Sequence, residues 1–151
     1  MIALSAEAMV KSLLFDGTYP AYTSTDFGAK IFPCSVTTCV SCSQRDVSTP
    51  FYDIKVEARI FSSAADVTYP ESSSDNNYHG AGDISTGAAH LLKVTALRSD
   101  ITGLTQSAME AAAAAEGMEL YVMKLTDQTT ESMDSDEYQS SFEFTILAGI
   151  A

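Results

Sequence analysis

The sequence predicts one α+β domain, residues 1–151, with a four-stranded, mostly antiparallel sheet and an N-terminal helix and two-helix crossover packed on one face. A length of 151 residues is typical of a single domain. Apolar residues recur with the helical period in some segments and alternate with polar residues in others. The resulting order is helix, two strands, helical crossover and two strands.

The first predicted helix covers residues 5–15, because its apolar residues have the spacing of one helix face. Ser5 is expected to cap its start, and Gly17 to end it in a left-handed conformation. Residues 18–28 are predicted to form a loop, since Tyr19-Pro20 favours extended geometry. The residues on the apolar face are Ala6, Met9, Val10, Leu13 and Leu14.

Two more helices are predicted to form the crossover. The first begins at residue 85 or 86 and ends before Gly103. The second covers about residues 105–116, which include a run of alanines, the residue with the highest helix propensity. Gly117 is the expected stop.

Four strands are predicted, at residues 31–42, 51–61, 118–126 and 138–147. The first two are joined by a turn and are expected to pair antiparallel. The second strand alternates most regularly, with charged residues on its other face, which indicates a sheet with one buried and one wet face. The residues on its apolar face are Tyr52, Ile54, Val56, Ala58 and Ile60.

Two polar connections are predicted to contact partner molecules. Residues 62–87 form an extended contact loop, since so long an unpatterned stretch in a compact domain is usually functional or orders on binding. Residues 127–137 form an acidic hairpin tip with five acids and no base, for which a solvated charged turn is the simpler interpretation. The candidate contact residues are Asp75, Asn76, Asn77, Tyr78, Asp127, Glu131, Asp134, Asp136 and Glu137.

The net charge of −12 is unevenly distributed along the chain. Residues 1–99 hold 10 acids and 7 bases, whereas residues 100–151 hold 10 acids and only Lys124. A field of this sign repels phosphate and disfavours wrapping of nucleic acid. No signal peptide and no apolar stretch of the ~20 residues that cross a bilayer is found, so a soluble chain made in reducing cytoplasm is expected.

Three cysteines raise the question of a metal site. Cys34, Cys39 and Cys42 have the C-x4-C-x2-C spacing of an iron–sulfur site, which needs a fourth thiolate that this chain lacks. A zinc site completed by His79 or His90 is the remaining alternative. Strand alternation would place Cys34 and Cys42 on one face and Cys39 on the other, so buried or half-buried strand residues are predicted instead.

No catalytic centre and no cofactor site are predicted. Asp75, Asn77 and Gly80 imitate the opening of a calcium loop, but Thr86 occupies the position that requires a bidentate glutamate. No Ser/His/Asp or Cys/His set can be assembled around His90. The chain is therefore predicted to be no enzyme and to hold neither a metal nor a cofactor.

The order and spacing of these segments resemble the tail terminator or head–tail completion (neck) proteins of tailed bacteriophages and phage-like particles. The likeness covers most of the chain and is architectural. Its parts are the N-terminal helix, Phe32-Pro33-Cys34-Ser35-Val36, the alternating strand Tyr52-Asp53-Ile54-Lys55-Val56-Glu57-Ala58, a Ser/Asp-rich loop, a helix containing histidine, and Tyr121-Val122-Met123-Lys124-Leu125, which an acidic turn joins to Tyr138-Gln139-Ser140-Ser141-Phe142-Glu143-Phe144-Thr145-Ile146-Leu147.

The resemblance implies a structural virion protein of the tail or neck, assembled in the host cytoplasm. Its copies would form a ring, usually a hexamer, that caps the tail tube and joins it to the head–tail connector or stopper protein. DNA would only pass through the channel, and no membrane would be involved. The alternatives are another tail or connector subunit, such as a tail tube or head-completion (stopper) protein, and a small metal-binding domain using Cys34, Cys39 and Cys42.

Overall fold

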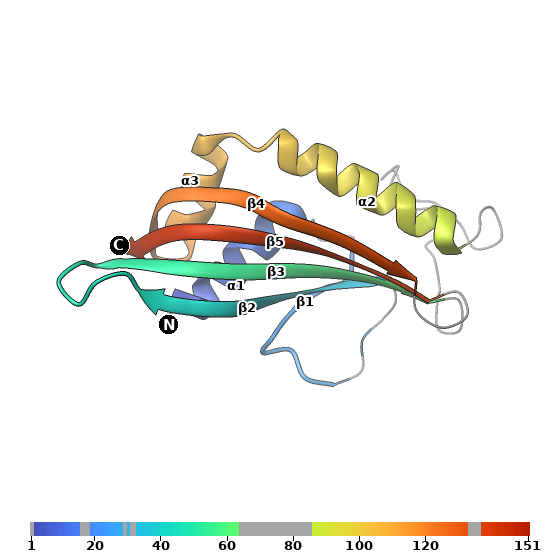
Figure 1. Ribbon diagram of the computed structural model, residues 1–151, viewed down its shortest axis with the longest axis horizontal. Coiled ribbons are helices and arrows are strands. Elements are labelled where there is room, and N and C mark those ends of the chain that lie inside the picture. Colours follow the sequence, from blue (N-terminus) through green and yellow to red (C-terminus); the bar gives the residue numbers. More distant parts are fainter. Residues whose placement is uncertain (1, 16–18, 29, 31–32, 64–85, 133–136) are drawn as a thin grey trace.

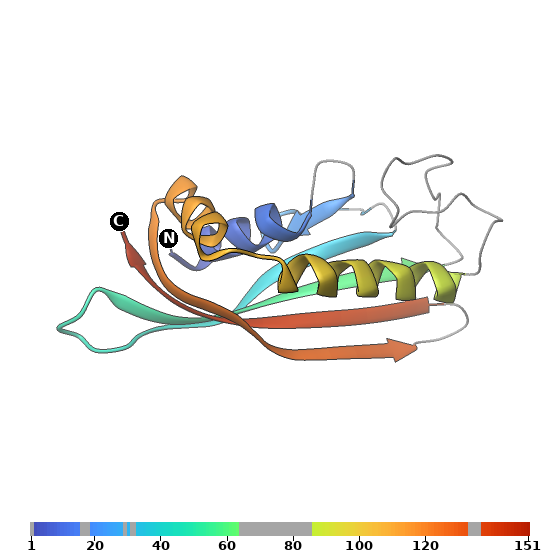
Figure 2. The ribbon, with the colours of Figure 1, turned by 90° about the horizontal axis from the view of Figure 1, so that it is seen from above.

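Three helices cover one face of a five-stranded sheet in the described part of the chain (Figures 1 and 2). The computed structural model describes residues 2–15, 19–28, 30, 33–63, 86–132 and 137–151. The predicted α+β class and helix-covered sheet are confirmed. The sheet has five strands rather than the predicted four, and it is mostly antiparallel, as predicted, with one parallel pair between its first two strands.

The helices lie close to their predicted positions. Helix α1 covers Ile2–Leu14, so Ser5 lies inside the helix and does not cap it as predicted. Helix α2 covers Thr86–Thr102 and α3 covers Gln106–Ala115. Thr105 caps α3 by accepting a hydrogen bond from the backbone of Ala108 at 3.1 Å. Gly117 follows with a φ of 75°, the left-handed stop that was predicted.

The strands are β1 Ala21–Thr23, β2 Cys34–Gln44, β3 Phe51–Ser63, β4 Met118–Ser132 and β5 Glu137–Ile150. Their order in the sheet is β1-β2-β3-β5-β4, so that β1 and β4 form opposite edges. Strand β1 is parallel to β2, whereas every other pair is antiparallel. Because β1 has three residues, it is too short to show an alternating pattern, and the sequence predicted a loop there.

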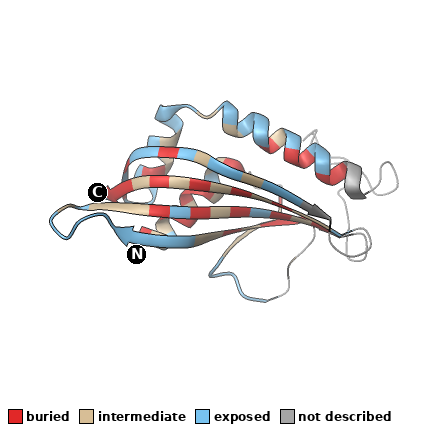
Figure 3. Cartoon of the chain, viewed as in Figure 1, coloured by how far each residue is buried: buried red, intermediate tan, exposed pale blue. Residues whose placement is uncertain are grey.

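The core lies between the sheet and the helices. In the centre Val56 pairs with Phe144 and Ala58 pairs with Phe142, and all four side chains are buried (Figure 3). Helix α1 covers β2 and β3, α3 covers β4, and α2 lies across β3 and β5. Apolar burial on this face, at roughly 25 cal/mol per Å², holds the two layers together. The helices contribute Ile2, Ala6, Met9, Val10, Leu14, Val94, Leu97 and Ala113.

A β-bulge changes the predicted faces of the cysteines. The register of β2 against β3 shifts between Cys39 and Ser41, so Cys39 pairs with Val56 and Cys42 with Ile54. Val56 and Ile54 both face the core, so Cys39 and Cys42 share that face. The predicted pairing of Cys34 and Cys42 on one face is therefore wrong, because the extra residue of a bulge inverts the alternation that follows it.

The two predicted contact segments are only partly described. Strand β4 continues to Ser132, so residues 127–132 are strand, and residues 133–136 between β4 and β5 lie outside the described part. The prediction that the hairpin tip begins at Asp127 is wrong, because pairing of β4 with β5 continues to Ser132 and Tyr138. Of residues 62–87, the first two end β3 and the last two begin α2.

Candidate interaction surface

One face of the sheet is covered by the helices, and the opposite face is left open by them (Figures 1 and 2). It consists of the outward positions of β3, β5 and β4, which alternate with the buried positions. Charged and hydroxyl side chains occupy most of it. The outward residues include Asp53, Lys55, Glu57, Arg59, Lys124, Asp127, Thr129, Gln139, Ser141, Glu143 and Thr145.

Three carboxylates form a row across the middle of this face. Glu57 of β3 is opposite Glu143 of β5, and Glu143 is in turn opposite Asp127 of β4. Like charges directly opposite on neighbouring strands repel one another. Asp127 was predicted as a contact residue but Glu57 and Glu143 were not, since cross-strand register is not visible in a single strand. We call Glu57, Glu143 and Asp127 the carboxylate row.

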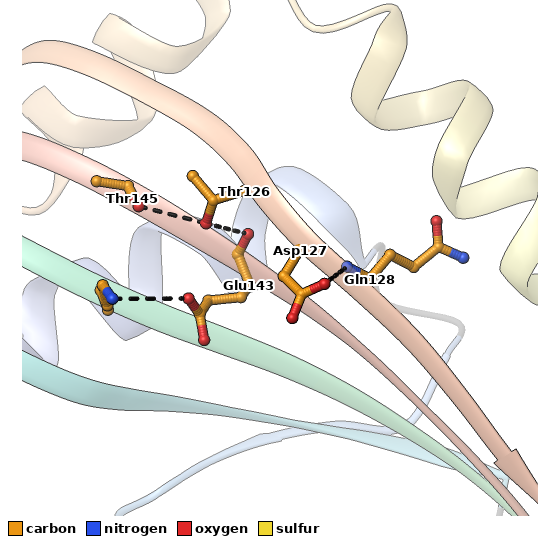
Figure 4. Close-up of polar contacts among 6 residues, drawn as sticks. Thr126, Asp127, Gln128, Glu143 and Thr145 are labelled. Atoms are coloured by element: carbon orange, nitrogen blue, oxygen red, sulfur yellow. Dashed lines mark hydrogen bonds and ion pairs between the residues drawn. The ribbon is translucent and has the colours of Figure 1, made fainter.

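Two cations and local hydrogen bonds offset this repulsion. Arg59 forms an ion pair with Glu57, and Lys55 Nζ lies 4.0 Å from Glu143 Oε1. Asp127 Oδ1 accepts a hydrogen bond from the backbone N–H of Gln128 at 2.8 Å (Figure 4). Because these groups are exposed or half-buried, each pair contributes little to stability. Two carboxylates of the row thus lie at ion-pair distance from a cation, and Asp127 accepts a backbone hydrogen bond.

Hydroxyl groups link β4 to β5 beside the carboxylate row. Thr126 Oγ1 donates to the backbone carbonyl of Glu143 at 3.2 Å, and Thr145 Oγ1 donates to Thr126 Oγ1 at 3.3 Å (Figure 4). The register of β4 shifts between Leu125 and Asp127, where Thr126 is the extra residue. These bonds hold the bulge in place and thereby set the direction of Asp127.

Of the other predicted contact residues, the structure describes Glu131 and Glu137. Glu137 begins β5 and is exposed, and Glu131 lies in β4. The remaining six predicted contact residues lie outside the described part of the chain; they are Asp75, Asn76, Asn77, Tyr78, Asp134 and Asp136. Their role in partner contacts stays a prediction.

A hairpin between β2 and β3 projects beyond the end of the sheet (Figure 1). Arg45 donates two hydrogen bonds to the Asp53 carboxylate, at 3.1 and 2.9 Å, which clamps the base of the hairpin. Both side chains of this ion pair are exposed, so the pair lies outside the core. At the tip the Val47 side chain is 95% exposed. The hairpin is thus an ordered projection that ends in an apolar residue.

A buried carboxylate joins α1 to the β1 edge. Glu7 is 3% exposed and accepts hydrogen bonds from the backbone N–H of Ser24 at 3.1 Å and of Cys39 at 2.8 Å. The Ser24 hydroxyl lies 2.7 Å from Oε1 and 2.8 Å from Oε2 of the same carboxylate. Sequence reasoning missed Glu7, although it precedes Val10 by three residues and Leu14 by seven, the spacing of the buried stripe.

His90 and two serines form a buried network. His90 Nδ1 lies 2.9 Å from Ser62 Oγ, and His90 Nε2 lies 2.8 Å from Ser140 Oγ. Burial lowers the pKa of His90 to about 4. A nucleophilic serine must reach a substrate, but Ser140 is fully buried, and Thr130 Oγ1 lies 2.9 Å from its hydroxyl. The network therefore fastens α2 to the sheet.

The cysteines show no metal-binding geometry. All three thiols are free, and burial is the main cause that raises the pKa of Cys34 and of Cys39 to about 11. Among the residues that the structure describes, no three His, Cys, Asp or Glu side chains are placed to hold a metal ion. No described helix has the length and apolar character needed to cross a membrane.

The fold and surfaces define an α+β protein with one helix-covered and one polar sheet face. A solved chain with this fold comes from a structure described as the virion of native gene transfer agent (GTA) particle. The two chains superpose with a TM-score of 0.51 over 97% of this chain and 95% of that one, at 12% sequence identity. At this identity the likeness shows the fold alone. A scan against protein-family models gives no match, and neither does a comparison with curated proteins.

Proposed function

We propose that this chain is a non-catalytic structural subunit of a phage-like virion, and that its copies form the ring that closes the tail tube and joins it to the head–tail connector. The observation that carries the proposal is the shared fold with a virion chain over nearly the full length of both proteins.

The edges of the sheet support a subunit that assembles with others. Strand β4 is an edge strand over Met118–Ser132. On the opposite side β1 pairs only with residues 35–37 of β2, which leaves the rest of β2 without a strand neighbour there among the described residues. Unpaired strand edges are ready contacts for another chain. Different edges on opposite sides suit the head-to-tail contacts from which a closed ring is built.

The polar sheet face suits a particle through which DNA moves. Its three lysine and arginine side chains, Lys55, Arg59 and Lys124, lie among four acids, so the face has no excess of positive charge with which to hold phosphates. Stable nucleic-acid binding instead requires several Lys or Arg contacts to phosphates. DNA is accordingly proposed to pass the ring without being held by it.

Electron microscopy of the assembled particle tests the proposal directly. The expected result is a closed ring of this chain, proposed to contain six copies, at the junction of tail tube and connector. A continuous helical stack along the tail would identify a tube subunit instead, and density on the head side of the connector would identify a head-completion protein. Either position would contradict the terminator role, and absence from the particle would contradict any virion role.

A further inference from the structure

Strand β2 carries two cysteines at the positions that flank its β-bulge. Cys39 pairs with Val56 of β3, and Cys42 pairs with Ile54. Val40 lies between the two cysteines without a partner in β3 and is the extra residue of the bulge. Val56 and Ile54 both face the core, so the two cysteines face the same way. The bulge therefore brings to one face a pair that regular alternation would place on opposite faces.

The bulge also shortens the distance between the two cysteines. Three residues of a regular strand span about 10 Å, at about 3.3 Å per residue. The three residues from Cys39 to Cys42 instead lie opposite the two-residue step from Val56 to Ile54, which spans about 6.6 Å. The Cα atoms of disulfide-bonded cysteines are about 4.4–6.8 Å apart. The pair therefore lies at the upper end of the range in which a disulfide forms.

Two further observations place the thiols close together. The Cys39 thiol donates a hydrogen bond to the carbonyl of Ser41 at 3.4 Å, so its Sγ is directed along the strand toward Cys42. Burial is the main cause that raises the pKa of Cys39, and the charge of Cys42 is the next, which requires the two sulfurs to be near each other. Cys42 is exposed and Cys39 is half-buried, so a reagent in solution reaches Cys42 first.

Cys34 is too distant to join this pair. It is fully buried at the start of β2 and lies five residues before Cys39, a separation of roughly 16 Å along a regular strand. It also pairs with Phe61, whose neighbour Ile60 faces the core, so Cys34 belongs to the other face of the strand. Cys34 is therefore an internal control for any reaction of the pair.

We propose that Cys39 and Cys42 form an intramolecular disulfide when the chain meets a low-molecular-weight disulfide such as oxidised glutathione, and that this bond fixes the β-bulge of β2. The bond is absent under the reducing conditions of a cytoplasm and forms in oxidising surroundings. This chemistry does not depend on the proposed function, because it needs only one folded chain and the oxidant.

The oxidation is a thiol–disulfide exchange in two steps. In the first step the Cys42 thiolate attacks one sulfur of the oxidant, which forms a mixed disulfide and releases one small thiolate. In the second step the Cys39 thiolate attacks the Cys42 sulfur, which forms the bond between the two cysteines and releases the other half of the oxidant. The two released thiolates take up the protons that the cysteines lost, so one disulfide forms and one is reduced to two thiols.

The surroundings of the pair favour a structural bond over a catalytic dithiol. Burial is the main cause that raises the pKa of Cys39 to about 11, and burial also raises the pKa of Cys42. Little thiolate is then present at neutral pH, so the bond forms slowly. Thiols with a high pKa are also poor leaving groups, so other thiols open the bond slowly once it has formed.

The bond lies beside the joint between α1 and the sheet. The backbone N–H of Cys39 donates to the buried carboxylate of Glu7 at 2.8 Å. Val40, whose side chain is 56% exposed, lies inside the ring that the disulfide closes. Fixing the bulge keeps the Cys39 N–H directed at Glu7, so local opening of β2 at this point is reduced.

Oxidation of the purified chain, followed by peptide mass spectrometry, tests the proposal. After prolonged incubation with oxidised glutathione at pH 8 and alkylation in denaturant, the wild type should show one reactive thiol in place of three. The peptide covering residues 31–45 should then carry one alkyl group, on Cys34, and fragmentation should show the bond between Cys39 and Cys42. A lasting glutathione adduct on Cys42, a disulfide between two chains, or three unreacted thiols overturns the proposal.

Single substitutions identify the two sulfurs. Cys34→Ala is expected to form the bond as the wild type does, and Cys34→Ser replaces it if circular dichroism shows that the first variant does not fold. Cys39→Ser should stop after the first step and retain glutathione on Cys42. Cys42→Ser should form no intramolecular bond. An intramolecular disulfide in either of the last two variants, or its loss in the folded Cys34 variant, contradicts the pairing.

Hydrogen exchange measures the effect of the bond on the fold. The amides of residues 39–42 are expected to exchange at least about 5-fold more slowly in the oxidised wild type than in the reduced wild type, since the closed ring opposes local opening. Cys42→Ser treated with the same oxidant is the control and should show no such difference. Equal exchange in the two forms of the wild type would show that the bond does not fix the bulge.

Discussion

His90 Nε2 lies 2.8 Å from Ser140 Oγ, and this contact fastens the N-terminal half of α2 to the centre of the sheet. The imidazole also bonds Ser62 and stacks on Tyr138, with ring centroids 5.8 Å apart. A neutral imidazole donates through one nitrogen and accepts at the other, so it can bond both hydroxyls. Protonation would turn both nitrogens into donors and place a charge in a buried site.

Stability is therefore expected to rise with pH between about 4 and 6.5. The unfolded chain binds a proton at His90 near pH 6.5, whereas burial lowers the pKa in the folded chain to about 4. In this window the unfolded state binds more protons, so folding stability falls as the pH is lowered, by up to about 3 kcal/mol. Urea unfolding of the wild type at several pH values measures the slope. His90→Gln is expected to flatten it, and an unchanged slope would contradict the assignment to His90.

Glu7→Ala is expected to destabilise the protein by roughly 3 kcal/mol. The substitution removes a buried carboxylate and leaves the half-buried backbone N–H groups of Ser24 and Cys39 without their acceptor. Glu7→Gln retains one acceptor oxygen and should lose about half as much. The exposed Glu137→Ala is the control, with a change within about 0.5 kcal/mol. Chemical denaturation measures all three, and equal midpoints for Glu7→Ala and the control would show that the carboxylate is dispensable.

The three cysteines are expected to react with a thiol reagent at very different rates. Cys42 is exposed, Cys39 is half-buried and Cys34 is fully buried, and burial raises the pKa of both Cys39 and Cys34 to about 11. Because the thiolate is the reactive species, Cys42 should be labelled first and Cys34 only upon unfolding. Peptide mass spectrometry after timed labelling at pH 8 gives the order. Early labelling of Cys34 would show that β2 opens in the native state.

Asp127→Asn is expected to stabilise the fold by a few tenths of a kcal/mol, since it removes one like-charge pair from the carboxylate row. The amide oxygen can still accept from Gln128, so the bulge should persist. Glu119→Gln is the matched control on the same strand, because Glu119 is opposite Gly149 rather than an acid. Thermal unfolding at low and high salt measures the difference, which should vanish in high salt. A loss of stability would show that the Asp127 charge has a favourable partner.

Long periodic segments made much of the fold predictable. Helix α3 was predicted within one residue at either end because Thr105 and Gly117 are strong local end signals. Strand β3 begins at Phe51 as predicted, since its alternation is regular. By contrast, β1 and the end of β4 depend on the neighbouring strand that supplies their hydrogen bonds. The pattern of residues within one segment does not show which strand it will pair with.

The candidate surfaces were less predictable than the fold. The acidic character of residues 127–137 is plain in the sequence, but the carboxylate row exists only because β4 and β3 both pair with β5. Phe27 lies in the predicted loop 18–28, of which residues 21–23 instead form β1, and nothing in its neighbours signals that its side chain is exposed. A small cleft between the α2–α3 connection and strands β4 and β5 is likewise lined by residues from separate segments, which no single stretch of sequence reveals.

The sequence by itself determined the class of the fold, the helices, the principal strands and the uneven charge, because these follow from local propensity and periodicity. Only the tertiary structure decided the strand order, the β2 bulge that brings Cys39 and Cys42 to one face, and the burial of Glu7 and His90. Each of these depends on hydrogen bonds and contacts between residues far apart in the chain. Such contacts form only when the whole core is assembled, so they cannot be predicted from the periodicity of a single segment.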